Sequence, residues 1–285
     1  MKLKRKETRK EPEFFNSASN IPTLNYQVYY MKPIEKTANF LVAFVIGALV
    51  GYLFYGGIGK DEFGQPTPLT WILNLVIPVT VGIVAGKLFL PVRVKSIIAK
   101  RKTALSQQFR DMLDGLTTSL GAGRNVNDAF FAVYDDLKLQ YDENAYILKE
   151  LEVIIAGIHN NIAIEEVLED FGRRSGIGDI KSFADVFKVS YRKGGNIKDV
   201  IRNTHSILSD KMEITEEIET LVTSNKTEQN IMIFMPVALI GVIKIMSPDF
   251  SKNFVTPTGI ISTTFSILIF VIAYFVGKSV LDIKI

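Results

Sequence analysis

Four long apolar blocks divide a chain that otherwise carries charge throughout. They are residues 39–58, 69–90, 230–247 and 259–277, and their charged residues are Lys87 and Lys244. A helix needs roughly 20 apolar residues to cross the ~30 Å hydrocarbon layer of a bilayer. The blocks approach or reach this length and lack the polar face of a surface helix. We therefore predict four transmembrane helices in two hairpins, with buried helices of a large soluble protein as the alternative.

Between the hairpins, residues 93–229 carry apolar side chains at helical spacing. Phe109, Leu113, Leu116 and Leu120 recur every three or four positions, which places them on one face of a helix. Similar stripes follow at Val126, Ala129, Phe130, Val133 and Leu137; Leu148, Leu151, Ile154 and Ile155; Ile164, Val167, Leu168 and Phe171; Phe183, Val186, Phe187 and Val189; and Ile197, Val200, Ile201, His205 and Leu208. Strand-like alternation is absent. The fold class is thus an all-α polytopic membrane protein whose hairpins flank an antiparallel bundle of about six helices.

The expected helix corners share a glycine followed by a capping residue. Gly123 precedes Asn125 and Asp128, and Gly195 precedes Asn196 and Asp199. Glycine takes the left-handed conformation that stops a helix, and asparagine caps the next helix. A third corner, assigned to Gly157, lacks the asparagine. We interpret these corners as structural. From Ile197 a long helix is expected to run through Lys226 toward the third block.

Basic residues are distributed unevenly around the four blocks. They cluster before the first, after the second and after the fourth, whereas each loop within a hairpin holds one lysine, Lys60 or Lys252. Because Lys and Arg accumulate in cytoplasmic segments, both termini and the middle region are expected to be cytoplasmic. Residues 1–36 are expected to form a basic tail, poorly ordered to about Asn25 and lying against anionic membrane lipid. Residues 278–285 form a second tail. Lys87 and Lys244 are expected to extend their ammonium groups to the interface.

Small residues recur in the first hairpin. Gly47 and Gly51 lie four residues apart in the first block, as do Gly82 and Gly86 in the second. This spacing lets two helix backbones approach closely within a bilayer. We therefore predict that these four glycines pack the first hairpin.

Composition and motifs limit the chemistry that the chain can perform. It has no cysteine, two histidines and a formal net charge of +3 at pH 7. This excludes a thiol nucleophile and a cysteine-based metal site, and it gives no reason to expect nucleic-acid binding. Hydrolase, zinc-protease, nucleotide-binding and kinase motifs are absent from the sequence. We therefore expect no enzyme activity, no cofactor, no metal and no catalytic residue.

Three stretches together resemble a known family. They are the run from Phe109 to Gly123, the run Phe171-Gly-Arg-Arg-Ser175 with Asp179, Ile180 and Phe183 after it, and Gly194-Gly195-Asn196-Ile197. They resemble the type II secretion system F domain. Two hairpins around a single such domain are similar to the TadB and TadC proteins of the tight-adherence (Flp) pilus machinery. Other members of the family carry two copies of the domain.

The resemblance implies a non-enzymatic platform in the inner membrane. Such a platform couples a cytoplasmic pilus-assembly ATPase to the extraction and polymerisation of pilin subunits. A single domain copy implies pairing with a second F-domain protein or with another copy of this chain. The alternatives are a small membrane transporter or channel subunit with a cytoplasmic regulatory domain, and a membrane-anchored signalling protein or enzyme.

The expected partner contact lies on the polar face of the cytoplasmic bundle. It comprises Arg173, Arg174, Arg192, Lys193, Gly194, Gly195 and Asn196. Arg173 and Arg174 form a basic pair in an otherwise acidic region, and we expect the pair to be exposed to an acidic partner. Ordinary pairing with Glu169 and Asp170 on the same helix is the alternative.

Overall fold

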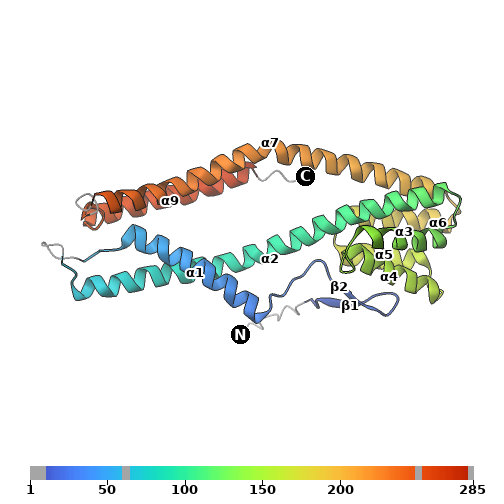
Figure 1. The fold of residues 1–285 in the computed structure, drawn as a ribbon, viewed down its shortest axis with the longest axis horizontal. Helices are drawn as coiled ribbons and strands as arrows, with labels where there is room; N and C mark the ends of the chain where they lie inside the picture. The colour runs from blue at the N-terminus through green and yellow to red at the C-terminus, as the bar shows by residue number, and fades with distance from the viewer. Residues whose placement is uncertain (1–10, 60–64, 248–251, 282–285) are drawn as a thin grey trace, which may run out of the picture. The chain divides into compact units, whose positions relative to one another are not determined.

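The computed structural model describes residues 11–59, 65–247 and 252–281. In these residues the chain forms eight helices and one two-stranded sheet (Figure 1). The described residues up to Tyr30, together with Val94–Glu213, make one compact unit, which we call the helical unit. The described residues of Met31–Arg93 and those from Ile214 onward make a second, the membrane unit.

The helical unit is built around the C-terminal part of one long helix. Its helical segments are the end of α2 (Pro68–Gly121), α3 (Val126–Gln140), α4 (Tyr146–His159), α5 (Ile164–Ser175), α6 (Gly178–Arg192) and the start of α7 (Ile197–Met246). Phe109 of α2 is fully buried, with its ring centroid 6.1 Å from that of Phe171 and 5.4 Å from that of Phe183. Edge-on contacts between aromatic rings add to the burial of their apolar area. The predicted helical character of this region is confirmed.

The predicted apolar stripe is buried on α5 and, apart from the half-buried Leu120 and Val126, on α2 and α3, but α6 departs from its prediction. On α6 the buried side chains are Ile180, Phe183, Ala184 and Phe187. Val186 and Val189 are instead 51% and 53% exposed. The residues at 180, 183, 184 and 187 form the face of α6 that packs on the core, and Val186 and Val189 fall outside it.

One predicted corner has the expected geometry, a second has it one residue earlier than predicted, and the third does not have it. The left-handed glycines are Gly123, with φ of 85°, and Gly194, with φ of 68°, rather than Gly195. Their neighbours make matching bonds, Arg124 N–H to the Ser119 carbonyl and Gly195 N–H to the Ser190 carbonyl, as in a Schellman motif. The Asn125 side chain accepts the Asp128 N–H at 2.9 Å, and Asn196 accepts that of Asp199 at 3.3 Å.

At the third corner, Gly157 lies inside α4 rather than beyond its end. The left-handed residue there is Asn161, with φ of 55°. Asparagine tolerates this conformation better than other residues that have a Cβ atom. The assignment of the third corner to Gly157 is therefore wrong.

The N-terminal segment carries a hairpin that belongs to the helical unit. Strands β1 (Phe14–Asn16) and β2 (Pro22–Leu24) pair antiparallel, with Phe14 opposite Leu24. The Ser19 hydroxyl donates to the Val153 carbonyl at 2.8 Å, and Tyr26 is 1% exposed. The expectation of a poorly ordered tail is wrong for residues 11–25, because these contacts order them. Residues 1–10 lie outside the described residues.

The membrane unit contains the apolar stretches. Four helices are long and apolar enough to cross a membrane: α1 (Pro33–Tyr55), α2, α7 and α9 (Pro257–Leu281). The mean hydropathy of their most apolar windows is 2.0, 2.1, 1.8 and 2.2, respectively. Four such helices are compatible with a multi-pass membrane protein. The bounds of two spans differ from the prediction. α1 covers Pro33–Tyr55 rather than residues 39–58, and α9 covers Pro257–Leu281 rather than residues 259–277. Residues 282–285 of the second tail lie outside the described residues.

The four glycines of the first hairpin lie where α1 and α2 approach each other. A Cβ atom on Gly47 would lie 2.7 Å from the Cβ of Ala85, and one on Gly82 would lie 2.7 Å from the Phe44 carbonyl oxygen. Gly51 faces the Pro78 backbone, and Gly86 faces the Phe40 ring. Real Cβ atoms do not tolerate contacts below 3.0 Å. A side chain at Gly47 or Gly82 would therefore push the two helices apart.

Candidate functional site

Arg174 lies inside the helical unit, although its sequence pattern predicted a position on the surface. Its side chain is 1% exposed and donates three hydrogen bonds. Nε donates to Asp170 Oδ2 at 2.8 Å, and Nη1 and Nη2 donate to the two oxygens of Glu150 at 2.9 and 2.7 Å. The prediction of an exposed basic pair is therefore wrong for Arg174. The alternative of pairing with Glu169 and Asp170 on the same helix is confirmed for Asp170 only, because Glu169 pairs with Lys188 of α6 at 2.6 Å.

The N-terminal hairpin segment completes this buried network. The Tyr26 hydroxyl donates to Glu150 Oε1 at 2.9 Å, and the Ala18 N–H lies 3.4 Å from Asp170 Oδ2. Burial alone would lower the pKa of Arg174, but its hydrogen bonds to Glu150 and Asp170 and their charges raise it above its ordinary value. Burial and the neighbouring Glu150 raise the pKa of Tyr26 well above its ordinary value. The network therefore holds a permanent guanidinium cation between two carboxyl groups, and its role is to fix the hairpin to α4 and α5.

One residue of this network could have been recognised from its position in the sequence. Glu150 lies three residues after Ile147 and four before Ile154, so it falls within the apolar stripe of α4. A carboxylate in such a stripe requires a buried cationic partner. The identity of that partner depends on the packing of α4 against α5, which the stripe alone does not specify.

Arg173 remains exposed but is separated from the other predicted contact residues. Its side chain is 77% exposed and pairs with Asp170 at 2.6 Å. Arg192 pairs with Glu165 at the opposite end of α5. Eight residues of helix separate Glu165 from Arg173, or about 12 Å. The structure therefore does not bring Arg173 and Arg192 into one patch.

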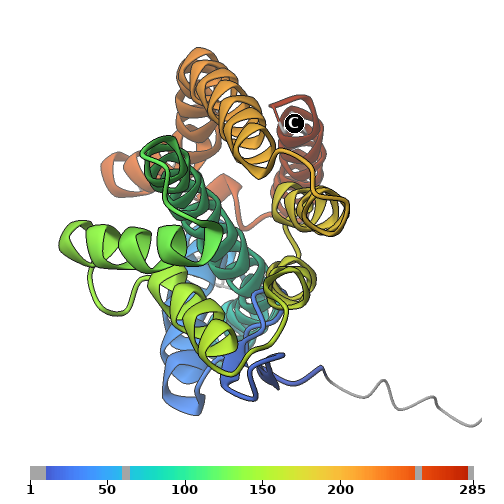
Figure 2. The same ribbon diagram turned by 90° about the vertical axis from the view of Figure 1, so that its right-hand side faces the viewer.

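The remaining predicted residues lie in what we call the corner patch, residues 123–128 and 191–196. Arg192, Lys193, Gly194, Gly195 and Asn196 are all exposed. A hollow of about 460 Å³ is lined by Leu120, Arg124–Asp128 and Tyr191. Tyr191 belongs to the last turn of α6, so this hollow brings the α2–α3 corner next to the end of α6. Figure 2 views the molecule from the side on which these corners lie.

Charge in the corner patch is mixed: of its three exposed cations, Arg192 is in an ion pair, and the other two are Arg124 and Lys193. Arg192 Nε contacts Glu165 Oε1 at 3.1 Å, and its Nη2 lies 3.7 Å from Glu166. Arg124 and Lys193 are exposed and form no ion pair with the side chains that the structure describes. A surface cation of this kind has its full charge available to an acidic partner. Arg192 is oriented by α5, and a Cβ atom on Gly123 or Gly194 would meet nothing within 4 Å.

The two histidines have structural surroundings. The His159 ring lies 5.2 Å from the Phe131 ring, and His205 Nε2 lies 3.8 Å from Asp114 and 3.4 Å from the Ser209 hydroxyl. Within the described residues, no group of three His, Cys, Asp or Glu side chains is placed to hold a metal ion.

Comparisons with protein-family models, with curated proteins and with solved structures find no match for this chain.

Proposed function

We propose that this chain is a non-enzymatic membrane platform that docks a cytoplasmic motor. The membrane is the inner membrane, and the helical unit and both termini are cytoplasmic. In the specific form implied by the motif resemblance, the platform belongs to a tight-adherence pilus or a related secretion system. The motor is then an assembly ATPase, and the cargo is pilin. A second F-domain protein or another copy of the chain supplies the second domain.

The observation that carries the proposal is the continuity of two helices. α2 is one helix of 54 residues and α7 one helix of 50 residues. Each joins an apolar stretch long enough to span a membrane to residues of the helical unit, such as Phe109 on α2 and Leu208 on α7. Both of these side chains are buried in the core of that unit. A load applied to the helical unit would therefore reach the apolar stretches through unbroken helix.

The corner patch supplies the docking surface in this proposal. Its exposed cations, Arg124 and Lys193, meet acidic groups on the motor. Arg192 is held against Glu165 and contributes donors that its ion pair leaves available. The experiment compares wild-type chain with the double variant Arg192→Glu, Lys193→Glu. Each tagged protein is solubilised from native membranes, and the co-purifying chains are identified by mass spectrometry. We expect recovery of the ATPase to fall about tenfold or more in the variant, because reversed charges repel the same partner surface.

Lys138→Glu is the matched control. Lys138 is also exposed, but it lies at the opposite end of α3 from the corner patch. This variant should recover the ATPase as the wild type does. Equal recovery from all three proteins would argue against the corner patch. Recovery of no ATPase and no F-domain partner from the wild type would argue against the platform itself.

A further inference from the structure

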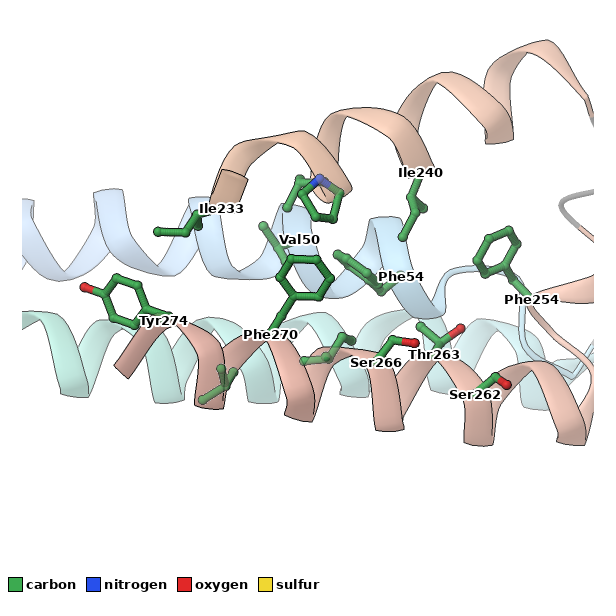
Figure 3. Close-up of a pocket in the computed structure, with 14 residues that line it drawn as sticks. Val50, Phe54, Ile233, Ile240, Phe254, Ser262, Thr263, Ser266, Phe270 and Tyr274 are labelled. Carbon is green, nitrogen blue, oxygen red and sulfur yellow. The ribbon is translucent and has the colours of Figure 1, made fainter. Parts of the chain in front are cut away.

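The membrane unit contains an elongated apolar hollow. It has a volume of about 540 Å³ and lies between α1, α7 and α9 (Figure 3). Ile233 and Ile240 of α7 line it together with Phe270 of α9. Val50 and Phe54 line it from α1. The polar side chains on its wall are mainly hydroxyls near one end, from Ser262, Thr263 and Ser266. Water is a poor occupant for such a space, because the apolar wall offers it few hydrogen-bond partners.

A second hollow extends the first along the same two helices. It has a volume of about 310 Å³ and shares Ile233, Phe270 and Tyr274 with the first. We call the combined space the α7–α9 groove. Its far end is lined by Asn225, Glu228 and Gln229. The groove therefore has an apolar body and one polar end.

The polar end carries an available carboxylate. Glu228 is exposed and forms no ion pair with the side chains that the structure describes. Gln229 donates from Nε2 to the Tyr274 carbonyl at 3.4 Å, which leaves its side-chain oxygen available as an acceptor. Asn225 adds a second amide on the same face of α7. This set offers acceptors to an ammonium group and amide donors to a phosphate.

The length of the groove matches one leaflet of a bilayer. From Asn225 to Ile240, α7 rises about 22 Å at 1.5 Å per residue. From Ser262 to Gly277, α9 rises by the same amount. Half of a bilayer that is ~40–45 Å thick, headgroups included, is about 20–22 Å. A partner helix that spans the membrane would need ~30 Å of apolar contact, which is longer than this groove.

We propose that the α7–α9 groove binds one phospholipid with a primary ammonium headgroup, from the leaflet on the side where α7 enters the membrane. An acyl chain fills the space lined by Ile233, Val237 and Phe270. The ammonium donates to Glu228, and the Asn225 amide donates to the phosphate. A choline headgroup has no N–H to donate, and a glycerol headgroup has no cation, so both bind more weakly.

The test uses the full chain in phosphatidylcholine nanodiscs that contain a small fraction of photoreactive lipid. Three probes carry the same diazirine-labelled acyl chain on phosphatidylethanolamine, phosphatidylcholine or phosphatidylglycerol. We expect the ethanolamine probe to label peptides of α7 and α9 about tenfold more than the other two. Glu228→Gln should reduce this labelling to the level of the choline probe.

Two tryptophan variants separate the groove from the rest of the helix surface. Ala273→Trp places an indole in the groove, and Ala238→Trp places one on the other side of α7. We expect the first variant to lose labelling by all three probes and the second to keep the wild-type pattern. Equal labelling by the three headgroups would overturn the proposal, as would labelling that Ala273→Trp leaves unchanged.

A second copy of the chain is the competing occupant. Because the chain has no cysteine, Ile233→Cys introduces a single thiol into the groove. Under oxidising conditions this variant should remain monomeric in nanodiscs if lipid fills the groove. A disulfide-linked dimer formed through Cys at this position would overturn the proposal.

Discussion

Replacing Arg174 with methionine should destabilise the helical unit severely. The substitution removes three charged hydrogen bonds, two to Glu150 and one to Asp170. Glu150 is 2% exposed and would keep only the Tyr26 hydroxyl among the bonds described above. Removing one partner of a buried ion pair costs about 3–5 kcal/mol, because the remaining charge has lost both its partner and water. For a unit of this size that corresponds to a fall in Tm of roughly 6–20 °C.

Pulse proteolysis of the full chain in nanodiscs, across a urea series, measures this loss. The cleavage midpoint should fall sharply for Arg174→Met, and cleavage should begin near the N-terminal hairpin and α4. Arg173→Met is the matched control, since its exposed ion pair with Asp170 contributes about 0–1 kcal/mol. The double variant Arg174→Met, Glu150→Met should recover part of the loss, because it leaves fewer charges buried without a partner. If Arg174→Met lowered the midpoint no more than Arg173→Met does, the assignment of this network as the anchor of the hairpin would be refuted.

Two further predictions concern the membrane hairpin and alkaline pH. Gly82→Ala would place a Cβ atom 2.7 Å from the Phe44 carbonyl oxygen. This contact should lower the stability of the membrane unit by about 1–3 kcal/mol. Thermal unfolding, followed by the fluorescence of the single tryptophan, Trp71, measures the change. Gly121→Ala, which meets nothing within 4 Å, should change this stability little, and equal effects would contradict the close α1–α2 packing. Burial, then the hydrogen bond to Asp111, raises the pKa of Tyr141 to about 12. The pKa of Tyr141 in the folded protein exceeds its value of about 10 in the unfolded chain. Its contribution to the stability of the folded protein is therefore fully present below pH 10 and is lost between pH 10 and 12. The Tyr141→Phe variant should therefore lose less stability than the wild type between pH 10 and pH 12. A variant whose stability falls with pH as the wild type's does would contradict this prediction.

The apolar helices and most helices of the helical unit can be predicted from the local sequence pattern. Blocks of about membrane length with at most one charged residue specify apolar helices almost independently of context. The stripe at Phe109, Leu113 and Leu116 specifies which face of α2 is buried. Asn125 and Asn196 specify helix starts, because a cap depends only on residues three positions apart.

The features that the sequence analysis missed depend on contacts between distant residues. Arg174 is buried because Glu150, 24 residues earlier, lies across from it. The hairpin strands have three residues each, too few to show alternation, and they are held by Val153 and Glu150 rather than by their own composition. On α6, two valines matched a helical stripe but fell outside the face that packs. An apolar stripe locates the buried face of a helix only approximately when apolar residues also lie beside that face.

The most direct test of the account is clean deletion of this chain in its native host, followed by complementation. Surface filaments are counted by electron microscopy, and the ATPase turnover of the isolated motor is measured in parallel. If the chain is the platform, deletion should abolish filaments and leave motor turnover unchanged. The wild-type chain should then restore the filaments, and the Arg192→Glu, Lys193→Glu variant should not. Normal filaments in the deletion strain would contradict this role.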